Sequence, residues 1–195
     1  MDWTRSEAEA LLFEWTQGPG LRAHALAVEA ALRAYARKFQ EDEGLWGLTG
    51  LLHDLDYERH PTREEHPRVG VAHLREKGAP EEMLQAILGH AEYLDVPRES
   101  RLAKALFAVD ELVGLITAVA LVNPSRDVRQ VKPGSVRKKW KDKAFARGVN
   151  REDIEKGARE LEMPLEDHIA FTLEAMQGAA GRLGLDGRGS DFREA

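Results

Sequence analysis

The stretch Leu48-Thr49-Gly50-Leu51-Leu52-His53-Asp54-Leu55-Asp56-Tyr57 decides the fold of this 195-residue chain. Its four leucines recur at the spacing of one helix face and predict an apolar stripe that packs into a core. His53 and Asp54 interrupt that stripe. Burying an imidazole beside a carboxylate is costly unless a partner is present. A divalent metal ion is a suitable partner, because neutral imidazole and carboxylate are both good metal ligands.

Other predicted helices carry residues of the same kinds. His24 interrupts the apolar face of a helix predicted at about residues 21–39. His90 extends the apolar face of another helix by one turn. Asp110 lies on the apolar face of a helix predicted at about residues 99–122, where an unpaired carboxylate would be costly. With a further histidine at the start of a short helix, the candidate metal ligands are His24, His53, Asp54, His66, His90 and Asp110.

The chain is predicted to be all-α, because no alternating strand pattern of useful length occurs. Thr4 opens a capping box that predicts the first helix, and Asp42 is the predicted cap of the helix that precedes His53. We expect residues 1–123 to form the helical core. Residues 124–195 are predicted to be a C-terminal helical extension packed on the same domain, with a tail that frays from about residue 184.

Composition limits the class of protein. Hydrophobic residues make up 43% of the chain and charged residues 32%, as in an ordinary soluble domain. The longest nearly apolar run, residues 112–122, is too short to span a bilayer, and no signal peptide is visible. The absence of cysteine excludes disulfides and thiol nucleophiles. We therefore expect a cytoplasmic protein without membrane attachment; its net charge of −6 argues against bulk nucleic-acid binding. The sequence does not indicate an oligomeric state.

The ordered set of histidines and aspartates resembles the HD superfamily of metal-dependent phosphohydrolases. The resemblance covers about residues 20–120. The matching pieces are Leu21-Arg22-Ala23-His24, Leu51-Leu52-His53-Asp54, His66-Pro67-Arg68-Val69-Gly70, Ala86-Ile87-Leu88-Gly89-His90 and Ala108-Val109-Asp110. The resemblance implies an HD-domain helical bundle, here with additional C-terminal helices.

The resemblance also implies roles for the ligands. Residues matching His24, His53, Asp54 and Asp110 hold one metal in the family. In its two-metal branches, residues matching His66 and His90 hold a second metal, and the match to Asp54 bridges the two. The expected cofactor is one or two divalent transition-metal ions: Mn, Fe, Ni, Co or Zn, with Mg also compatible. The chain lacks the Gly-Tyr-Pro signature of one class of cyclic-dinucleotide phosphodiesterase, which lowers the expectation of that substrate.

Basic residues give the candidate contacts to substrate phosphate. Nine basic residues stand against two acidic ones in residues 126–147, a segment that can attract a phosphorylated molecule. In the competing interpretation, Ser135 caps an amphipathic helix packed through Val136, Trp140 and Phe145, and its lysines are solvated. The candidate substrate-binding residues are Arg68, Lys104, Lys138 and Lys139.

The remaining titratable residues are assigned outside the ligand set. His60, His73 and His168 are expected at the surface or behind the ligands. Three acids are expected on solvated helix faces, with a supporting role behind the ligands as the alternative: Asp56, Glu92 and Glu111.

The sequence thus predicts an enzyme that cleaves a phosphate ester of a nucleotide or a related small molecule through a metal-activated water. Asp54 and His53 are the residues expected to act in catalysis. The expected partner is a small phosphorylated substrate. Two alternatives remain open: a non-catalytic nucleotide- or RNA-binding HD module, and an HD-type di-iron oxygenase.

Overall fold

A computed structural model describes residues 3–188 of the chain. Within these residues the chain forms nine α-helices and two 3-10 turns, and the only strand-like pairing is an isolated bridge between Asp127 and Asp186. The predicted all-α fold is confirmed.

The chain divides into two compact units, residues 1–107 and 108–195. The division falls inside one continuous helix, α6 (Arg101–Val122). It does not test the predicted domain limits of 1–123 and 124–195, which stay predictions. The other helices of the first unit are α1 (Arg5–Trp15), α2 (Pro19–Phe39), α3 (Glu43–Leu52), α4 (Arg68–Glu76), α5 (Glu81–His90) and the 3-10 turn η1 (Glu92–Leu94).

Local side-chain contacts fix where the first helices begin. Thr4 accepts a hydrogen bond from the Glu7 amide, and the Glu7 carboxylate accepts one from the Thr4 amide, so the predicted capping box is confirmed. Asp42 accepts from the Leu45 amide at 3.0 Å and caps α3 as predicted. Pro19 occupies the first turn of α2, where the backbone amides have no partner within the helix, so the missing N–H of proline loses no hydrogen bond. The helix therefore includes Pro19 and begins two residues earlier than predicted.

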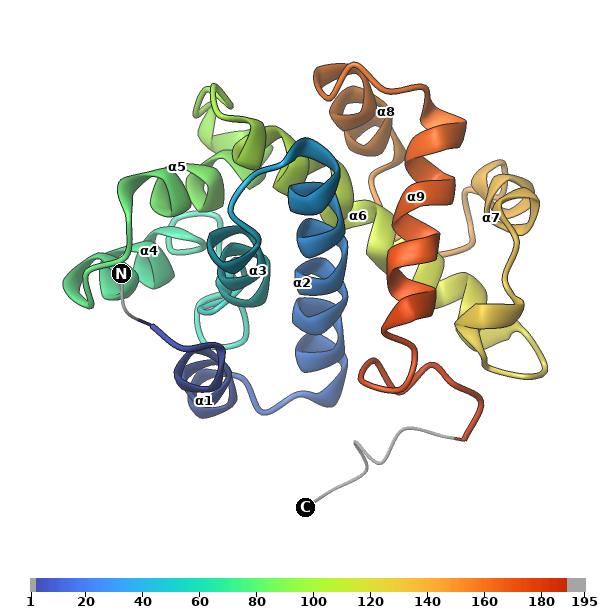
Figure 1. Ribbon diagram of the computed structural model, residues 1–195, viewed down its shortest axis with the longest axis horizontal. Coiled ribbons are helices and arrows are strands. Elements are labelled where there is room, and N and C mark those ends of the chain that lie inside the picture. Colours follow the sequence, from blue (N-terminus) through green and yellow to red (C-terminus); the bar gives the residue numbers. More distant parts are fainter. Residues whose placement is uncertain (1–2, 189–195) are drawn as a thin grey trace. The chain divides into compact units, whose positions relative to one another are not determined.

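The most extensive packing in the first unit joins α2 to α3, which lie side by side in Figure 1. A Cβ on Gly50 would lie 2.9 Å from the Glu29 amide nitrogen, so glycine lets the two helix backbones meet. The Glu29 carboxylate is fully buried and accepts from Arg5 at 2.7 Å and Arg33 at 2.8 Å. Burial opposes its ionisation, but these two hydrogen bonds prevail and hold the pKa of Glu29 below its usual value.

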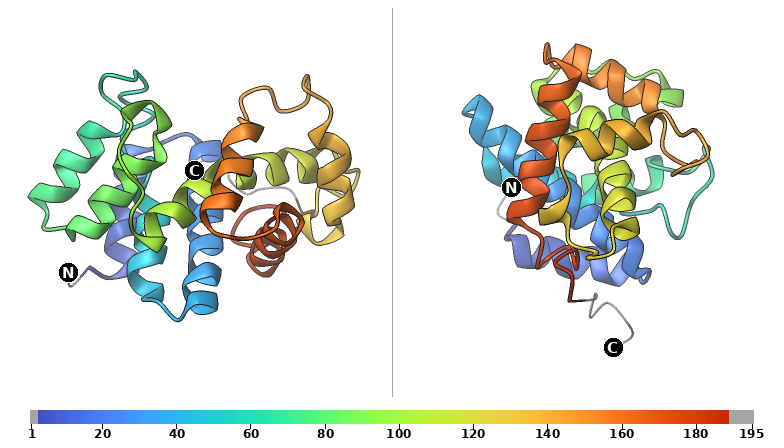
Figure 2. Two further views of the ribbon diagram at one scale, coloured as in Figure 1. Left: turned by 90° about the horizontal axis from the view of Figure 1, so that it is seen from above. Right: turned by 90° about the vertical axis from the view of Figure 1, so that its right-hand side faces the viewer.

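Two shorter helices complete the first unit. Helix α5 packs against both α3 and α4, and the left view of Figure 2 shows α4 and α5 (green) side by side.

Helix α6 is long and apolar enough to cross a membrane by length and composition alone. However, 61% of its most apolar window is buried within the protein, as in the core helix of a soluble protein.

The second unit contains the rest of α6 and three further helices packed mainly through α9. Its elements are η2 (Val128–Gln130), α7 (Pro133–Trp140), α8 (Arg151–Glu160) and α9 (Leu165–Gly178), and α9 contacts each of the others. Figure 2 shows α9 beside α8 in the right-hand view. Lys132, not Ser135, precedes α7, because Pro133 takes the first helical turn; the predicted Ser135 cap is wrong.

His168 lies in the core of this unit and not at the surface, which corrects that part of the prediction. Its side chain is fully buried on α9, and its Nε2 donates to the Ala108 carbonyl at 2.8 Å. Burial lowers the pKa of His168 to about 4, so the ring is neutral at pH 7. The neighbouring buried residues of α9 are mostly apolar and disfavour a charged ring. The histidine therefore occupies this position in its neutral form, as a hydrogen-bond donor.

Only the start of the tail from residue 184 is described. Leu185 is buried, and its carbonyl accepts from the Val128 amide at 2.8 Å. Residues 189–195, which the fraying prediction also covers, lie outside the described residues.

Candidate metal centre

Four histidines point their Nε2 atoms at one carboxylate, that of Asp54. His24 and His53 lie 3.9 and 3.5 Å from Oδ2 of Asp54. His66 and His90 lie 3.5 and 3.4 Å from Oδ1. Each carboxylate oxygen therefore faces its own pair of imidazoles.

The Nδ1 atoms of three of these rings are held from behind. Nδ1 of His53 donates to the Gly50 carbonyl at 2.8 Å, and Nδ1 of His90 donates to the Ile87 carbonyl at 2.5 Å. Nδ1 of His66 lies 2.8 Å from the Asp56 carboxylate. Because carbonyls and carboxylates only accept, the proton of each neutral ring sits on Nδ1. This tautomer leaves the Nε2 lone pair directed at Asp54, as a metal ligand requires.

The fold brings these side chains together from separate elements. His24 lies in the second turn of α2, and His53 is the residue at which α3 ends. Asp54 follows in the turn, with 19% of its side chain exposed, while His53, His66 and His90 are buried. His90 is the last residue of α5. The close α2–α3 contact at Gly50 therefore sets the spacing of His24 and His53, whose ring centroids lie 5.2 Å apart.

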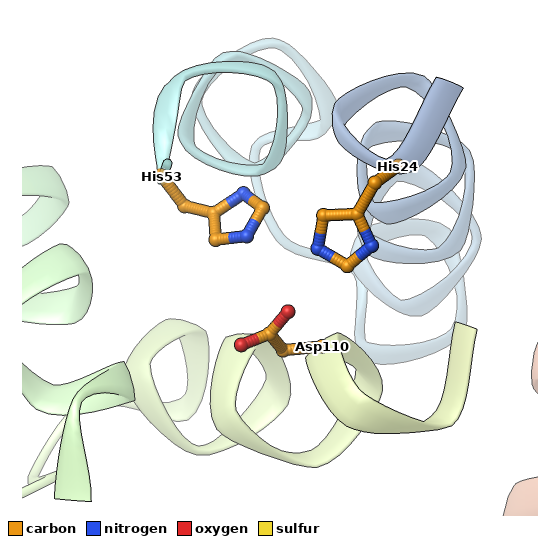
Figure 3. A group of neighbouring side chains, drawn as sticks. All are labelled: His24, His53 and Asp110. Carbon is orange, nitrogen blue, oxygen red and sulfur yellow. The ribbon is translucent and has the colours of Figure 1, made fainter. Parts of the chain in front are cut away.

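Asp110, on α6, adds a second carboxylate to the His24 side. His24, His53 and Asp110 each offer one ligand atom, and these atoms lie within 4.8 Å of one another. Figure 3 shows the two imidazoles and the Asp110 carboxylate pointing toward one another. A second such group consists of His53, Asp54 and His90.

The donor set fits a divalent metal. Two ligand atoms that each lie about 2.0–2.2 Å from the same ion are roughly 3–3.5 Å from one another. The distances between the histidine Nε2 atoms and the Asp54 oxygens are close to this separation. Neutral imidazoles with carboxylates suit Zn, Fe, Mn, Co and Ni more than Mg, which prefers oxygen ligands. The six predicted ligands therefore fall into groups able to hold metal, and their assignment as ligands stays a prediction.

The burial of Asp56 differs from the main expectation for this residue. A solvated helix face was expected, with a supporting role behind the ligands as the alternative; the side chain is fully buried, so the first expectation is wrong. It contacts His66 through Oδ1 at 2.8 Å and accepts from the Gly70 amide through Oδ2 at 2.6 Å. The position of Asp56 inside the leucine stripe was an available signal, because a helical period places it beside Leu52.

The other acids and histidines hold local structure. Glu92 is exposed and pairs with Arg98 at 2.9 Å, while Glu111 accepts from the Asn150 amide at 3.1 Å. His60 is half-exposed and contacts Glu65 at 3.1 Å, and the His73 ring packs on Trp15.

The predicted phosphate-binding residues have different surroundings. Arg68 is exposed and donates to the Arg63 and Glu64 carbonyls, and Lys104 is half-buried on α6. Lys138 is exposed on α7, and the Lys139 ammonium lies 4.7 Å from the centre of the Phe145 ring. Lys138 and Lys139 belong to the second unit. All four roles stay predictions.

Two exposed tyrosines beside His66 are further candidates that the sequence reading did not select. Tyr57 and Tyr93 are each 41% exposed. The Tyr57 ring meets the His66 ring edge-on at 5.0 Å, and the Tyr93 hydroxyl donates to the His66 carbonyl at 2.7 Å. The Arg63 guanidinium lies over the Tyr93 ring at 5.1 Å. Both rings are among the few large apolar side chains that the described residues leave exposed, and both contact His66.

One protein family matches the chain. The sequence model described as HD domain matches residues 21–115, which include all six predicted ligands. Comparison with curated proteins and with solved structures found no match.

Proposed function

We propose that this chain, whose residues 21–115 match the HD domain family, is a phosphohydrolase that uses divalent metal to cleave a phosphate ester of a nucleotide or a related small molecule. Metal-dependent phosphate-ester hydrolysis is the general function of that family. The observation that carries the proposal is the convergence of four histidine Nε2 atoms on the two oxygens of Asp54.

The proposal assigns two metal positions. His24, His53 and Asp110 would hold one ion together with Asp54, and His66 and His90 would hold a second with the same carboxylate. A pair of ions in such a site polarises phosphoryl oxygens and lowers the pKa of a bound water toward neutrality. Asp54 would serve both ions, and the Gly50 carbonyl fixes the orientation of the His53 ring.

The protein's own residues bind and orient the substrate. Arg63 and Arg68 carry positive charge near Tyr93, and a phosphate ester needs such charge because its transition state spreads negative charge over several oxygens. Burial raises the pKa of the Tyr93 phenol, which keeps its proton and donates to the His66 carbonyl. Lys104, Lys138 and Lys139 remain proposed contacts.

The nucleotide is the finer part of the proposal, and two exposed rings support it. Stacking of a nucleobase on an aromatic face contributes about 1–3 kcal/mol of binding free energy, and it does so for every type of base. Tyr57 and Tyr93 offer such faces beside His66. We further propose a cytoplasmic protein without membrane attachment whose substrates are small molecules, not long nucleic acids.

The test is turnover after metal removal and reloading. Metal-free protein is loaded with Mn²⁺, Co²⁺, Ni²⁺, Zn²⁺ or Mg²⁺ and assayed for phosphate-ester cleavage on nucleoside phosphates, dinucleotides and glycerol phosphate. We expect metal-dependent turnover, higher kcat/KM on the nucleotides, and a loss on the order of 10³-fold in Asp54→Ala. Glu82→Ala, which removes an exposed carboxylate from α5, should behave like the wild type.

Other outcomes separate the alternatives. Tight nucleotide binding without cleavage under any metal would contradict the enzyme and support a binding module. Substrate oxidation with oxygen consumption, seen with iron alone, would contradict hydrolysis and support a di-iron oxygenase.

A further inference from the structure

The buried carboxylate of Asp56 distinguishes His66 from the two other histidines whose Nδ1 partners were described above. His53 and His90 contact backbone carbonyls, whereas His66 contacts a carboxylate. A fully buried carboxylate requires partners that compensate for its lost hydration. Here the partners are the His66 ring and the Gly70 amide, so Asp56 joins the imidazole to the first turn of α4.

We propose that Asp56 is a positioning residue that fixes the tautomer and orientation of His66 and so makes the Oδ1 side of Asp54 a second metal position. The inference rests on the proposed metal centre. A carboxylate behind a ligating imidazole holds the proton on the far nitrogen and raises the basicity of the near one. A backbone carbonyl is a neutral and weaker acceptor, so the two metal positions differ in what tunes them.

Gly70 leaves room for this arrangement. A Cβ at Gly70 would lie 3.1 Å from Cγ of Asp56 and 3.3 Å from its Oδ2. Both distances are tighter than ordinary contacts, so alanine here would push the carboxylate away from His66 or from the amide that it accepts. The contact of Asp56 with His66 thus depends on a glycine fourteen residues along the chain.

The other contacts of His66 hold its backbone and its ring edge. The Tyr93 hydroxyl donates to the His66 carbonyl, and Tyr57 packs edge-on against the ring. Neither contact determines which ring nitrogen carries the proton. Asp56 alone has that role among the His66 contacts described.

The decisive variant is Asp56→Asn, which keeps the shape and changes the hydrogen bonding. Its single amide oxygen is taken by the Gly70 N–H, which leaves the NH₂ group facing Nδ1 of His66. That nitrogen must then accept, and the ring proton moves to Nε2, where it blocks metal ligation. We expect the second equivalent of Mn²⁺ or Co²⁺ to bind 10–100-fold more weakly in metal titrations, with the first equivalent unchanged.

A readout without metal tests the same inference. In metal-free wild-type protein, ¹⁵N NMR of the His66 side chain should show the proton on Nδ1. In metal-free Asp56→Asn it should show the proton on Nε2.

Gly70→Ala should also weaken binding of the second equivalent of metal, and it provides a second variant if Asp56→Asn folds poorly. Glu29→Gln is the matched control: it alters another fully buried carboxylate, so it should lower stability and leave both metal affinities unchanged.

Three results would overturn the inference, and they are distinguishable from failure of the proposed function. Two equivalents bound with wild-type affinity in both Asp56→Asn and Gly70→Ala would remove Asp56 from the second position. A wild-type His66 protonated on Nε2 would contradict the assigned tautomer. Wild-type protein that binds one metal and still hydrolyses phosphate esters would overturn the second position alone, whereas wild-type protein that binds none overturns the proposed function as well.

Discussion

Asp54 has two carboxylate oxygens, and each faces a different pair of imidazoles. Nitrogen–oxygen distances of 3.4–3.9 Å are longer than direct hydrogen bonds, which lie near 2.7–3.2 Å. The distances from His53, His66 and His90, at 3.4–3.5 Å, match the separations of atoms that share a metal ion, and that from His24 is longer at 3.9 Å. At the residue scale this is the main reason to interpret the cluster as a metal centre and not as a set of core hydrogen bonds.

Sequence pattern selected the residues that face the cluster more clearly than the residue behind it. A histidine or aspartate on an apolar helix face is conspicuous, which made His24, His53, Asp54, His90 and Asp110 identifiable. For Asp56 the pattern left two positions open, a solvated helix face or a place behind the ligands, because its contact with the Gly70 amide joins positions fourteen residues apart. His168 was misplaced for a similar reason: its hydrogen-bond acceptor, Ala108, is sixty residues away.

The buried His168 predicts a pH dependence of stability. Its pKa falls from 6.5 to about 4 in the folded state because burial disfavours the charged ring. The unfolded state therefore binds a proton that the folded state refuses, and stability decreases as pH falls from about 6.5 to about 4. The loss from this residue is about 3 kcal/mol, and it is complete below pH 4.

Urea unfolding between pH 7.5 and 4 measures this effect. His168→Gln keeps an N–H donor for the Ala108 carbonyl but cannot titrate, so its stability should fall less steeply over that range than that of the wild type. Parallel curves for the two proteins would contradict the assigned pKa.

At the scale of elements, capping residues determined the helix limits well. Thr4 and Asp42 are polar side chains that satisfy free backbone amides at a helix start, and both caps were predicted. The start of α7 was misassigned because Pro133 and Ser135 compete as signals, and proline in the first turn overrides a later serine. The α2–α3 contact was not predictable, since it depends on which helices meet at Gly50.

That contact gives a prediction for Gly50→Ala. The added Cβ would lie 2.9 Å from the Glu29 amide nitrogen and 3.0 Å from its Cα, so α2 and α3 must move apart. We expect a loss of about 3 kcal/mol in the free energy of unfolding. Weaker metal binding at the position of His24 and His53 should accompany it, because these residues lie on the two helices that separate.

Gly20→Ala is the matched control on α2. A Cβ there meets no atom within 4 Å, so the substitution should be neutral or stabilise by about 0.5 kcal/mol. Thermal and urea unfolding with metal titration measure both variants. Equal stability and metal affinity in Gly50→Ala and Gly20→Ala would show that the close backbone contact does not position the site.

At the scale of the whole molecule, the predicted ligands are unevenly divided between the two units. Five of the six lie in residues 1–107, while Asp110 and the basic segment of residues 126–147 belong to residues 108–195. Helical class was predictable because hydrophobic periodicity is local. The division into units was not, because it depends on contacts between residues far apart in sequence.

The measurement that tests the central claim most directly is a crystal structure of the metal-loaded protein with anomalous scattering data. The account predicts two anomalous peaks beside Asp54, one near Oδ2 with His24, His53 and Asp110, and one near Oδ1 with His66 and His90. Metal found elsewhere in the molecule, with no anomalous peak at Asp54, would contradict the metal centre and the hydrolase built on it.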